Sequence, residues 1–343
     1  MKHVETSNAG EVFRKEYLNS VERLIRQKNE EAVRERERYA KQFRGHEEEY
    51  RLELVRQLGW PLNEYFAKKE GELSVPEVKK TFVTKEEDIS IYRLQLEVFP
   101  EFWYYGILFA KEDGKKRPLV ISQHGGQGTP ELCSSLYEEG SDNYNDMTQR
   151  LLQYDVNVFA PQMLLWNIPQ YGVSYDRDLL GNQLKRLGGS ITAMELTCLM
   201  RSLDYLLTLE VVDATKIGMA GLSYGGMYAL HMAALDVRLK STISCSYFCD
   251  RFHENWTDWT YQNSAYHFQD AETAMLVYPR KLHLAMGDKD HLFSWEKSCQ
   301  EFERIKQIYA DDLSWIDLTI FHGDHEFIKD DTLLEKLAEE MEE

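Results

Sequence analysis

The chain has 343 residues, of which 43% are hydrophobic, 12% aromatic and 29% charged. This is the composition of a globular protein, because a disordered chain has too few apolar residues to bury a core. With 40 Lys and Arg against 58 Asp and Glu, the formal net charge is -18, which disfavours binding to a nucleic-acid backbone.

The sequence also indicates where in the cell the protein is located. It contains no apolar run long enough to cross a membrane, and the residues after Met1 include no apolar segment of the kind found in secretory signals. The five cysteines are odd in number and scattered, which indicates reduced thiols. We therefore expect a cytoplasmic protein that does not bind membranes.

Residues 10–59 are dense in charge and nearly free of Gly and Pro. Apolar side chains such as Val21 and Ile25 recur at helical spacing, and Trp60-Pro61 ends the run. This pattern predicts two amphipathic helices that pack on a larger body, within a charged helical extension of residues 1–80. An oligomerisation arm or an active-site cover is the alternative. A long coiled coil is disfavoured because the apolar positions keep no strict seven-residue repeat.

After about residue 80, short runs rich in β-branched and aromatic residues predict strands. They cover residues 91–99, 102–110, 119–123, 156–160, 216–222, 241–248, 281–286 and 315–321. From the third strand onward, helical segments lie between most of them, at 145–153, 191–209, 227–235 and 295–309. The alternation predicts an α/β domain over residues 81–343, with a mostly parallel sheet of about eight strands and helices on both faces. The first two strands leave no room for a helix and predict an antiparallel hairpin.

The segment Gly221-Leu222-Ser223-Tyr224-Gly225 joins a predicted strand to a predicted helix. Gly-x-Ser-x-Gly in this setting is the pattern of a nucleophile elbow, in which a sharp turn lifts the serine hydroxyl above the sheet. Small residues two positions before and after the serine avoid clashes in that turn, and the helix N-terminus favours developing negative charge. The pattern predicts Ser223 as the nucleophile and the Tyr224 N–H as one oxyanion donor.

An elbow of this kind is followed along the chain by an acid and then by a histidine. Asp288 and Asp290 follow the seventh predicted strand, and His322 and His325 follow the last one. We favour Asp290, which lies deeper in its loop, and His325, which lies in the loop rather than at the strand end. A metal site in these loops is the alternative, but the serine elbow disfavours it, and we predict neither a metal nor a cofactor.

The second oxyanion donor is expected in the loop after an earlier strand, His124-Gly125-Gly126-Gln127-Gly128. Glycines there let the backbone approach a substrate oxygen closely. The Gly126 N–H is the first candidate and the Gln127 N–H is the second. A phosphate-binding role is weakly supported because the segment lacks the terminal Lys-Ser/Thr and the Gly-x-Gly-x-x-Gly spacing.

Two loops are predicted to form the pocket above the sheet, at about residues 163–180 and 249–277. Both are rich in aromatic residues, and Trp166 and Trp259 are the better candidates for contact with substrate. The alternative is that these aromatic rings pack beneath the loops as a small satellite core.

Several segments in order resemble the α/β-hydrolase superfamily, and within it the bacterial acetyl xylan esterase and dienelactone-hydrolase-like group. The resemblance covers residues 117–327 and rests on His124-Gly125-Gly126, Gly188-Gly189-Ser190, residues 201–206, 221–226, 234–238, 278–280, 287–293 and 323–327. The charged helical segment that ends near Trp60-Pro61 also looks like that group. The resemblance implies an α/β-hydrolase fold, the catalytic roles given above for Ser223, Asp290 and His325, and hydrolysis of short acyl esters, often acetyl groups on sugars.

These patterns together predict a serine carboxylic ester hydrolase that acts on a small-molecule ester. His325 would take the proton of Ser223 as the serine attacks the acyl carbon, Asp290 would orient His325, and water would hydrolyse the acyl-enzyme. One alternative is a peptidase of the prolyl-oligopeptidase kind. Such peptidases usually carry a β-propeller before the catalytic domain, whereas the 80 residues before this domain are predicted to be helical. Another is a hydrolase-fold protein that only binds. A homo-oligomer is compatible with the sequence.

Overall fold

The computed structural model describes residues 2–69, 71, 73–137, 142–164, 171–253 and 256–342. Within these residues, nine strands form one sheet in the order β1-β2-β3-β5-β4-β6-β7-β8-β9. Their bounds are β1 (Val78–Glu86), β2 (Ile89–Phe99), β3 (Phe102–Lys111), β4 (Arg117–Gln123), β5 (Asn157–Pro161), β6 (Val212–Leu222), β7 (Leu239–Cys245), β8 (Lys281–Gly287) and β9 (Ile316–Phe321). The first three strands pair antiparallel, as do β3 and β5, and every other pair is parallel. The mostly parallel sheet and its opening hairpin are therefore confirmed.

The sequence missed the first strand of this sheet. β1 has one neighbour, β2, and its residues are exposed or half-buried along its whole length. An edge strand of this kind carries lysines and glutamates where an inner strand would carry apolar side chains. Its sequence therefore lacked the apolar run by which the other eight strands were recognised.

Helices cover both faces of the sheet. The described helices are α1 (Glu11–Ala40), α2 (Glu47–Leu58), α3 (Leu62–Lys68), α4 (Pro130–Cys133), α5 (Met147–Leu151), α6 (Arg177–Arg186), α7 (Ile191–Leu206), α8 (Tyr224–Leu235), α9 (Asp270–Met275), α10 (Trp295–Ile308) and α11 (Thr332–Glu342). Alternate strand residues face opposite sides, so Leu119 and Ile121 join the larger buried cluster with α2, α3, α7 and α8. Val120 joins the smaller one with α5 and α11. The prediction of helices on both faces is confirmed.

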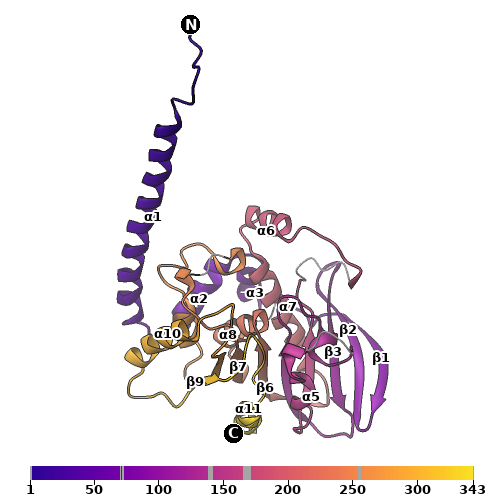
Figure 1. Ribbon diagram of the computed structural model, residues 1–343. Helices are drawn as coiled ribbons and strands as arrows, with labels where there is room; N and C mark the ends of the chain where they lie inside the picture. The colour runs from indigo at the N-terminus through magenta and orange to yellow at the C-terminus, as the bar shows by residue number, and fades with distance from the viewer. Residues whose placement is uncertain are drawn as a thin grey trace.

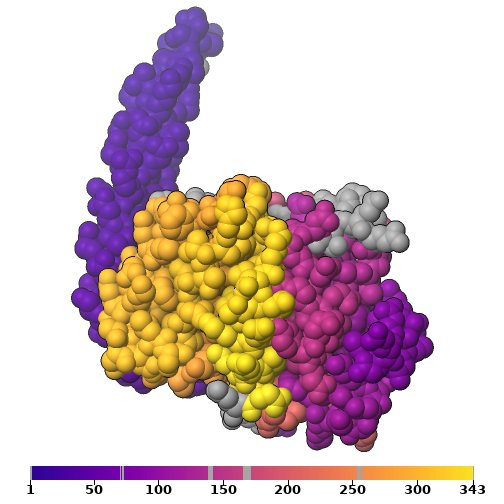
Figure 2. Space-filling view, turned by 60° about the horizontal axis from the view of Figure 1, so that its bottom comes forward, coloured from indigo at the N-terminus to yellow at the C-terminus, as the bar shows by residue number. Residues whose placement is uncertain are grey.

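The N-terminal helices differ in how they meet this body. α2 and α3 pack on α7, and Leu54 and Leu62 are fully buried in the same cluster as the sheet. α1 rises away from the body as an isolated arm (Figures 1 and 2), and within it only Ala32, Arg36 and Ala40 are buried. The two predicted amphipathic helices are present, and the division at residue 80 stays a prediction because the buried cluster includes residues from both sides of it.

No helix in the described ranges is both long and apolar enough to cross a membrane.

The loops that carry the predicted site residues lie at one edge of the sheet. Because β4 and β6 to β9 run parallel, their carboxyl ends meet at a single edge. Ser223, Asp290 and His325 all follow strands at that edge, after β6, β8 and β9.

Candidate active site

Ser223 occupies the sharp turn between β6 and α8. Its backbone has φ 59° and ψ -119°, a conformation that L-residues rarely adopt and that recurs at strained functional turns. The flanking glycines are sterically required, because a Cβ on Gly221 would lie 2.1 Å from the carbonyl oxygen of Gly225. A Cβ on Gly225 would lie as close to the carbonyl oxygen of Gln123. The turn therefore has the local geometry that the elbow motif predicted.

His325 and Asp290 are in direct contact. The Nδ1 of His325 lies 2.9 Å from Oδ2 of Asp290. The Asp290 side chain is 0% exposed and that of His325 is 11% exposed. The other carboxylate oxygen of Asp290 accepts hydrogen bonds from the N–H groups of Leu292 and Phe293, at 2.8 and 3.0 Å. Three hydrogen bonds thus fix this carboxylate in one orientation toward the imidazole.

The competing residues form separate pairs at the surface. His322 bonds Asp288 at 3.0 Å, and their side chains are 74% and 36% exposed. His291 bonds Asp324 at 2.7 Å, and both of these side chains are exposed. Among the described residues, no group of three or more His, Cys, Asp or Glu side chains could hold a metal ion. Burial therefore distinguishes the His325 pair from its neighbours.

Backbone contacts link the serine turn to the histidine loop through β7. The Ser223 N–H donates to the carbonyl oxygen of Cys245, the last residue of β7, at 2.8 Å. The next residue, Ser246, donates its hydroxyl to the carbonyl oxygen of Glu326 at 3.1 Å. Glu326 directly follows His325, so the ends of β6, β7 and β9 are held together at one edge.

The predicted oxyanion loop packs against the serine turn. A Cβ on Gly125 would lie 3.4 Å from the Cβ of Ser223, so the loop approaches Ser223 closely. The Gly125 N–H donates to the hydroxyl of Tyr144 at 2.9 Å, and the Gly128 N–H donates to the Gly125 carbonyl at 3.0 Å. Gly125 is therefore engaged within the protein, and the Gly126 and Tyr224 N–H groups stay the predicted donors.

His124 holds this loop in place and is itself buried. Its Nε2 accepts the Met163 N–H at 3.0 Å, so its Nδ1 carries the proton and donates to the Gly125 carbonyl at 2.7 Å. Burial lowers the pKa of His124 to about 4, so the ring stays neutral near neutral pH. The histidine thus acts as a neutral brace between the loop after β4 and the segment after β5.

The structure describes one of the two tryptophans that were predicted to bind substrate. Trp166 lies outside the described residues. Trp259 is 4% exposed and packs between the rings of Tyr224, Tyr247 and Phe293, an arrangement that fits the packing alternative. Trp256 stacks on it at 4.6 Å between ring centroids and is 40% exposed, so Trp256 presents the outer ring of the pair. Direct contact of Trp259 with substrate stays a prediction.

A cavity of about 610 Å³ lies beside Trp256. Residues of α2, α6, the start of α7 and the short helix η4 (Thr257–Trp259) line it, and both predicted pocket loops contribute. Asp258 on its wall accepts a hydrogen bond from the Tyr224 hydroxyl at 2.8 Å and pairs with the buried Arg177 at 3.2 Å. Because Tyr224 directly follows Ser223, this pair connects the cavity wall to the serine turn. Sequence reasoning missed Arg177 and Asp258, since they become partners only when the loops fold together.

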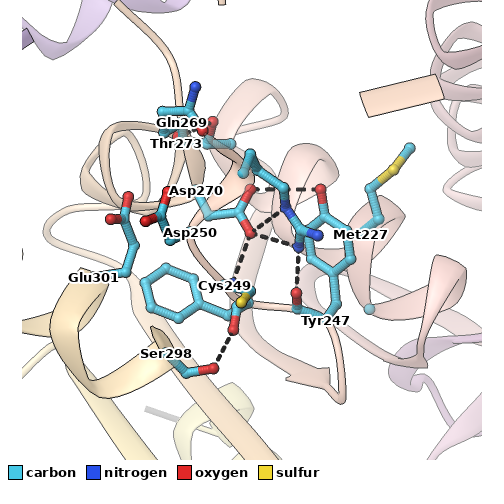
Figure 3. A network of polar contacts seen from close by, with 12 residues as sticks. Met227, Tyr247, Cys249, Asp250, Gln269, Asp270, Thr273, Ser298 and Glu301 are labelled. Carbon is cyan, nitrogen blue, oxygen red and sulfur yellow. Dashed lines mark hydrogen bonds and ion pairs between the residues drawn. The ribbon is translucent and has the colours of Figure 1, made fainter. Parts of the chain in front are cut away.

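A buried ion pair joins Arg251 to Asp270, and Figure 3 shows the polar contacts around Asp270. Asp270 accepts hydrogen bonds from Arg251 at 2.6 and 2.9 Å and from the Cys249 N–H at 2.9 Å, and the Tyr247 hydroxyl lies 3.4 Å away. The Arg251 guanidinium lies over the rings of Tyr247 and Phe293, at 3.8 and 5.2 Å. The Phe293 ring lies 5.7 Å from that of His325. This network therefore braces the loop after β7 against the loop that holds Asp290.

Comparisons with known proteins identify the fold. No family model matches the chain, and no curated protein matches it. Among solved structures, a glucuronoyl esterase from Solibacter usitatus is similar with a TM-score of 0.61 at 12% identity, over 87% of this chain and 92% of that one. Acetyl xylan esterase 1 from a Thermoanaerobacterium species gives 0.56 at 13% identity, over 83% and 98%. A cold-adapted esterase from an Arctic intertidal metagenomic library gives 0.53 at 17% identity, over 76% and 97%. The chain therefore has the α/β-hydrolase fold, and its structure is similar to those of acetyl xylan esterases and other esterases.

Proposed function

We propose that this chain is a serine carboxylic ester hydrolase that removes short acyl groups, acetyl in particular, from a small-molecule ester. The observation that carries the proposal is the buried Asp290–His325 pair at the edge of the sheet that also holds the strained Ser223 turn. A buried carboxylate bound to an imidazole, close to an elbow serine, is the arrangement by which unrelated hydrolases activate a hydroxyl.

In the proposed mechanism, His325 accepts the Ser223 proton on Nε2 as the serine oxygen attacks the acyl carbon. Asp290 keeps the other ring nitrogen protonated and stabilises the imidazolium that forms. The Tyr224 and Gly126 N–H groups hold the oxyanion. The imidazolium then gives its proton to the departing alcohol, and the same base activates water to release the acid from the acyl-enzyme.

The cavity beside Trp256 is where we expect the alcohol part of the ester. An aromatic ring that is partly exposed on a cavity wall can stack on the apolar face of a sugar. Arg177 and Asp258 supply charged groups on the same wall. This combination supports an acetylated sugar as the substrate class, in agreement with the names of some of the similar structures.

The first prediction tests the nucleophile. Wild-type protein should hydrolyse p-nitrophenyl acetate and should react covalently with a fluorophosphonate at Ser223, as located by peptide mass spectrometry. The Ser223→Ala variant should lose about 1,000-fold or more in kcat and should not be labelled, because no other group replaces the alkoxide. Ser314→Ala, an exposed serine in the loop before β9, is the matched control and should behave like the wild type.

Three results would reject the proposal. They are labelling at another residue, esterase activity that survives in Ser223→Ala, and cleavage of a proline-containing peptide amide in preference to the ester. The last of these would instead support the peptidase alternative. Acetylated sugars compared with esters of longer acyl chains would then define the acyl pocket.

A further inference from the structure

We propose that α1 is an arm by which one copy of this chain binds a second copy. The helix has 30 residues, and its first five turns make no buried contact with the body: the first buried residue along it is Ala32. Figures 1 and 2 show this part standing clear of the rest of the molecule. Such an arm offers two thirds of a long helix to an external partner.

The free part of α1 carries an apolar stripe. We define the α1 stripe as Phe13, Tyr17, Leu18, Val21, Leu24 and Ile25, whose side chains are between 36% and 76% exposed. At 100° per residue these six positions fall within a sector of about 140°, so they form one face of the helix. The face runs on toward Ala32 and Arg36, which pack on the body. The stripe is therefore an extension of the face that is buried further along.

A helix with this stripe is unfavourable alone in water. Isolated helices gain little from intrinsic propensity, and most helical stability in proteins comes from packing an amphipathic face. Contiguous apolar patches of several hundred Å² on a monomer mark interaction sites. Six side chains of this size and exposure present roughly 700 Å². The stripe therefore has the size of a face that a partner covers.

A second copy of the chain fits the requirement in area. If two copies of the stripe cover each other, about 1,400 Å² leaves water, which lies in the range of 1,200–2,000 Å² typical of specific interfaces. A two-fold pairing needs no surface other than the stripe itself, because a two-fold interface joins the same patch on both subunits.

The charge distribution indicates that two copies would meet through their arms and not through their bodies. Residues 11–40 contain eight Lys and Arg and seven Asp and Glu, so α1 has a net charge of +1. Because the whole chain has a net charge of -18, the remaining residues carry -19. Two nearly neutral arms can meet without like-charge repulsion, whereas two bodies of this charge repel each other. An anionic lipid surface would also repel the body, and the polar face of α1 lacks the excess of cations that favours lipid binding.

The experiment compares the oligomeric state of two matched variants. Sedimentation velocity of the full chain, over about a hundred-fold range of concentration, should show a dimer that dissociates on dilution. Leu24→Glu should weaken the dimer by about 100-fold, because each copy brings the new charge into the apolar contact. Val12→Glu makes the same kind of change on the opposite face of the same helix and should leave dissociation unchanged. Far-UV circular dichroism of Leu24→Glu at a concentration where the wild type is dimeric checks that the body remains folded.

The outcomes separate the candidate partners. A wild type that stays monomeric throughout the range would overturn the proposal, as would a dimer that Leu24→Glu leaves as tight as before. Co-sedimentation of the monomer with vesicles of phosphatidylserine and phosphatidylcholine would overturn it in favour of a lipid surface. None of these readouts depends on esterase activity, so the proposal stands or falls separately from the catalytic one.

Discussion

His325 and His322 follow the same strand, and each bonds an aspartate, yet their surroundings differ. The Asp290 and His325 side chains are shielded from solvent, whereas those of His322 and Asp288 lie open to it. An imidazole–carboxylate bond gains strength where water is excluded, because the local dielectric constant is lower. The order Ser, Asp, His could be predicted from the sequence. The shielding, which distinguishes one pair from the other, depends on neighbours such as Phe293, which lies in the Asp290 loop and contacts the His325 ring from across the site.

The second prediction concerns this pair. His325→Ala should lower kcat on p-nitrophenyl acetate by about 1,000-fold or more, since no base would then take the serine proton. His322→Ala should change it by less than about 3-fold, because that ring is exposed and, within the part of the chain that the structure describes, bonds Asp288 alone. Steady-state kinetics of both variants checks this. The opposite pattern would move the catalytic base to His322.

The depth at which Trp256 and Trp259 are buried could not be predicted from residue types alone. The sequence indicated that the loop after β7 is rich in tryptophan, but it gave no means of ordering the rings by depth. In the structure Trp259 is 4% exposed and lies 5.4 Å from the Tyr224 ring, whereas Trp256 stacks on Trp259 and is 40% exposed. Depth is a property of the folded loop, and no local pattern encodes it.

At the scale of elements, the strands and helices of the inner sheet were predictable, and the outer elements were less so. β1 was missed because it is an exposed edge, and α11 because it lies beyond residue 327, where the segments recognised by resemblance end. α11 nonetheless packs on β6 and β7 and buries Leu334, Leu337 and Met341. Its apolar positions follow helical spacing, so a search for periodicity in the last residues could have found it.

One buried histidine joins α11 to the sheet. His283 of β8 lies 3.0 Å from a carboxylate oxygen of Asp317 in β9 and 2.8 Å from one of Glu340 in α11. Glu340 also accepts a hydrogen bond from Ser241 of β7 at 2.7 Å. Burial alone would lower the pKa of His283, but its hydrogen bonds to Asp317 and Glu340 together outweigh burial and raise the pKa to about 8.

The third prediction follows from the sign of this shift. Because the folded pKa lies above the ordinary value of 6.5, the folded protein holds its proton longer than the unfolded chain does. This contribution, about 2 kcal/mol, is fully present below about pH 6.5 and is lost as the pH rises through about 8. Urea unfolding at about pH 6 and about pH 9 should show the decrease in the wild type and a smaller one in His283→Gln. Equal decreases in the two proteins would contradict the assignment.

For the whole molecule, the question is how the N-terminal helices relate to the body formed by the sheet and its covering helices. Amphipathic spacing predicts that a helix packs, but it does not identify the surface on which it packs, so the boundary at residue 80 rested on a change in composition. In the structure, Arg36 of α1 is buried between Glu272 of α9 and Glu301 of α10. Its Nε lies 2.8 Å from Glu272. Residues far apart along the chain thus share one buried ion cluster.

The last prediction tests whether this cluster makes the chain one cooperative unit. Arg36→Met removes the cation and leaves two carboxylates buried together, which should cost about 3–5 kcal/mol. If α1 and α2 belong to the cooperative core, the variant should still unfold in a single transition, at lower urea and at the same midpoint by circular dichroism and by tryptophan fluorescence. Arg34→Met, two residues away on an exposed face of α1, is the matched control and should unfold like the wild type within about 0.5 kcal/mol. Separate midpoints for the two probes would mean that the N-terminal helices unfold independently, and the predicted division at residue 80 would then describe a true domain boundary.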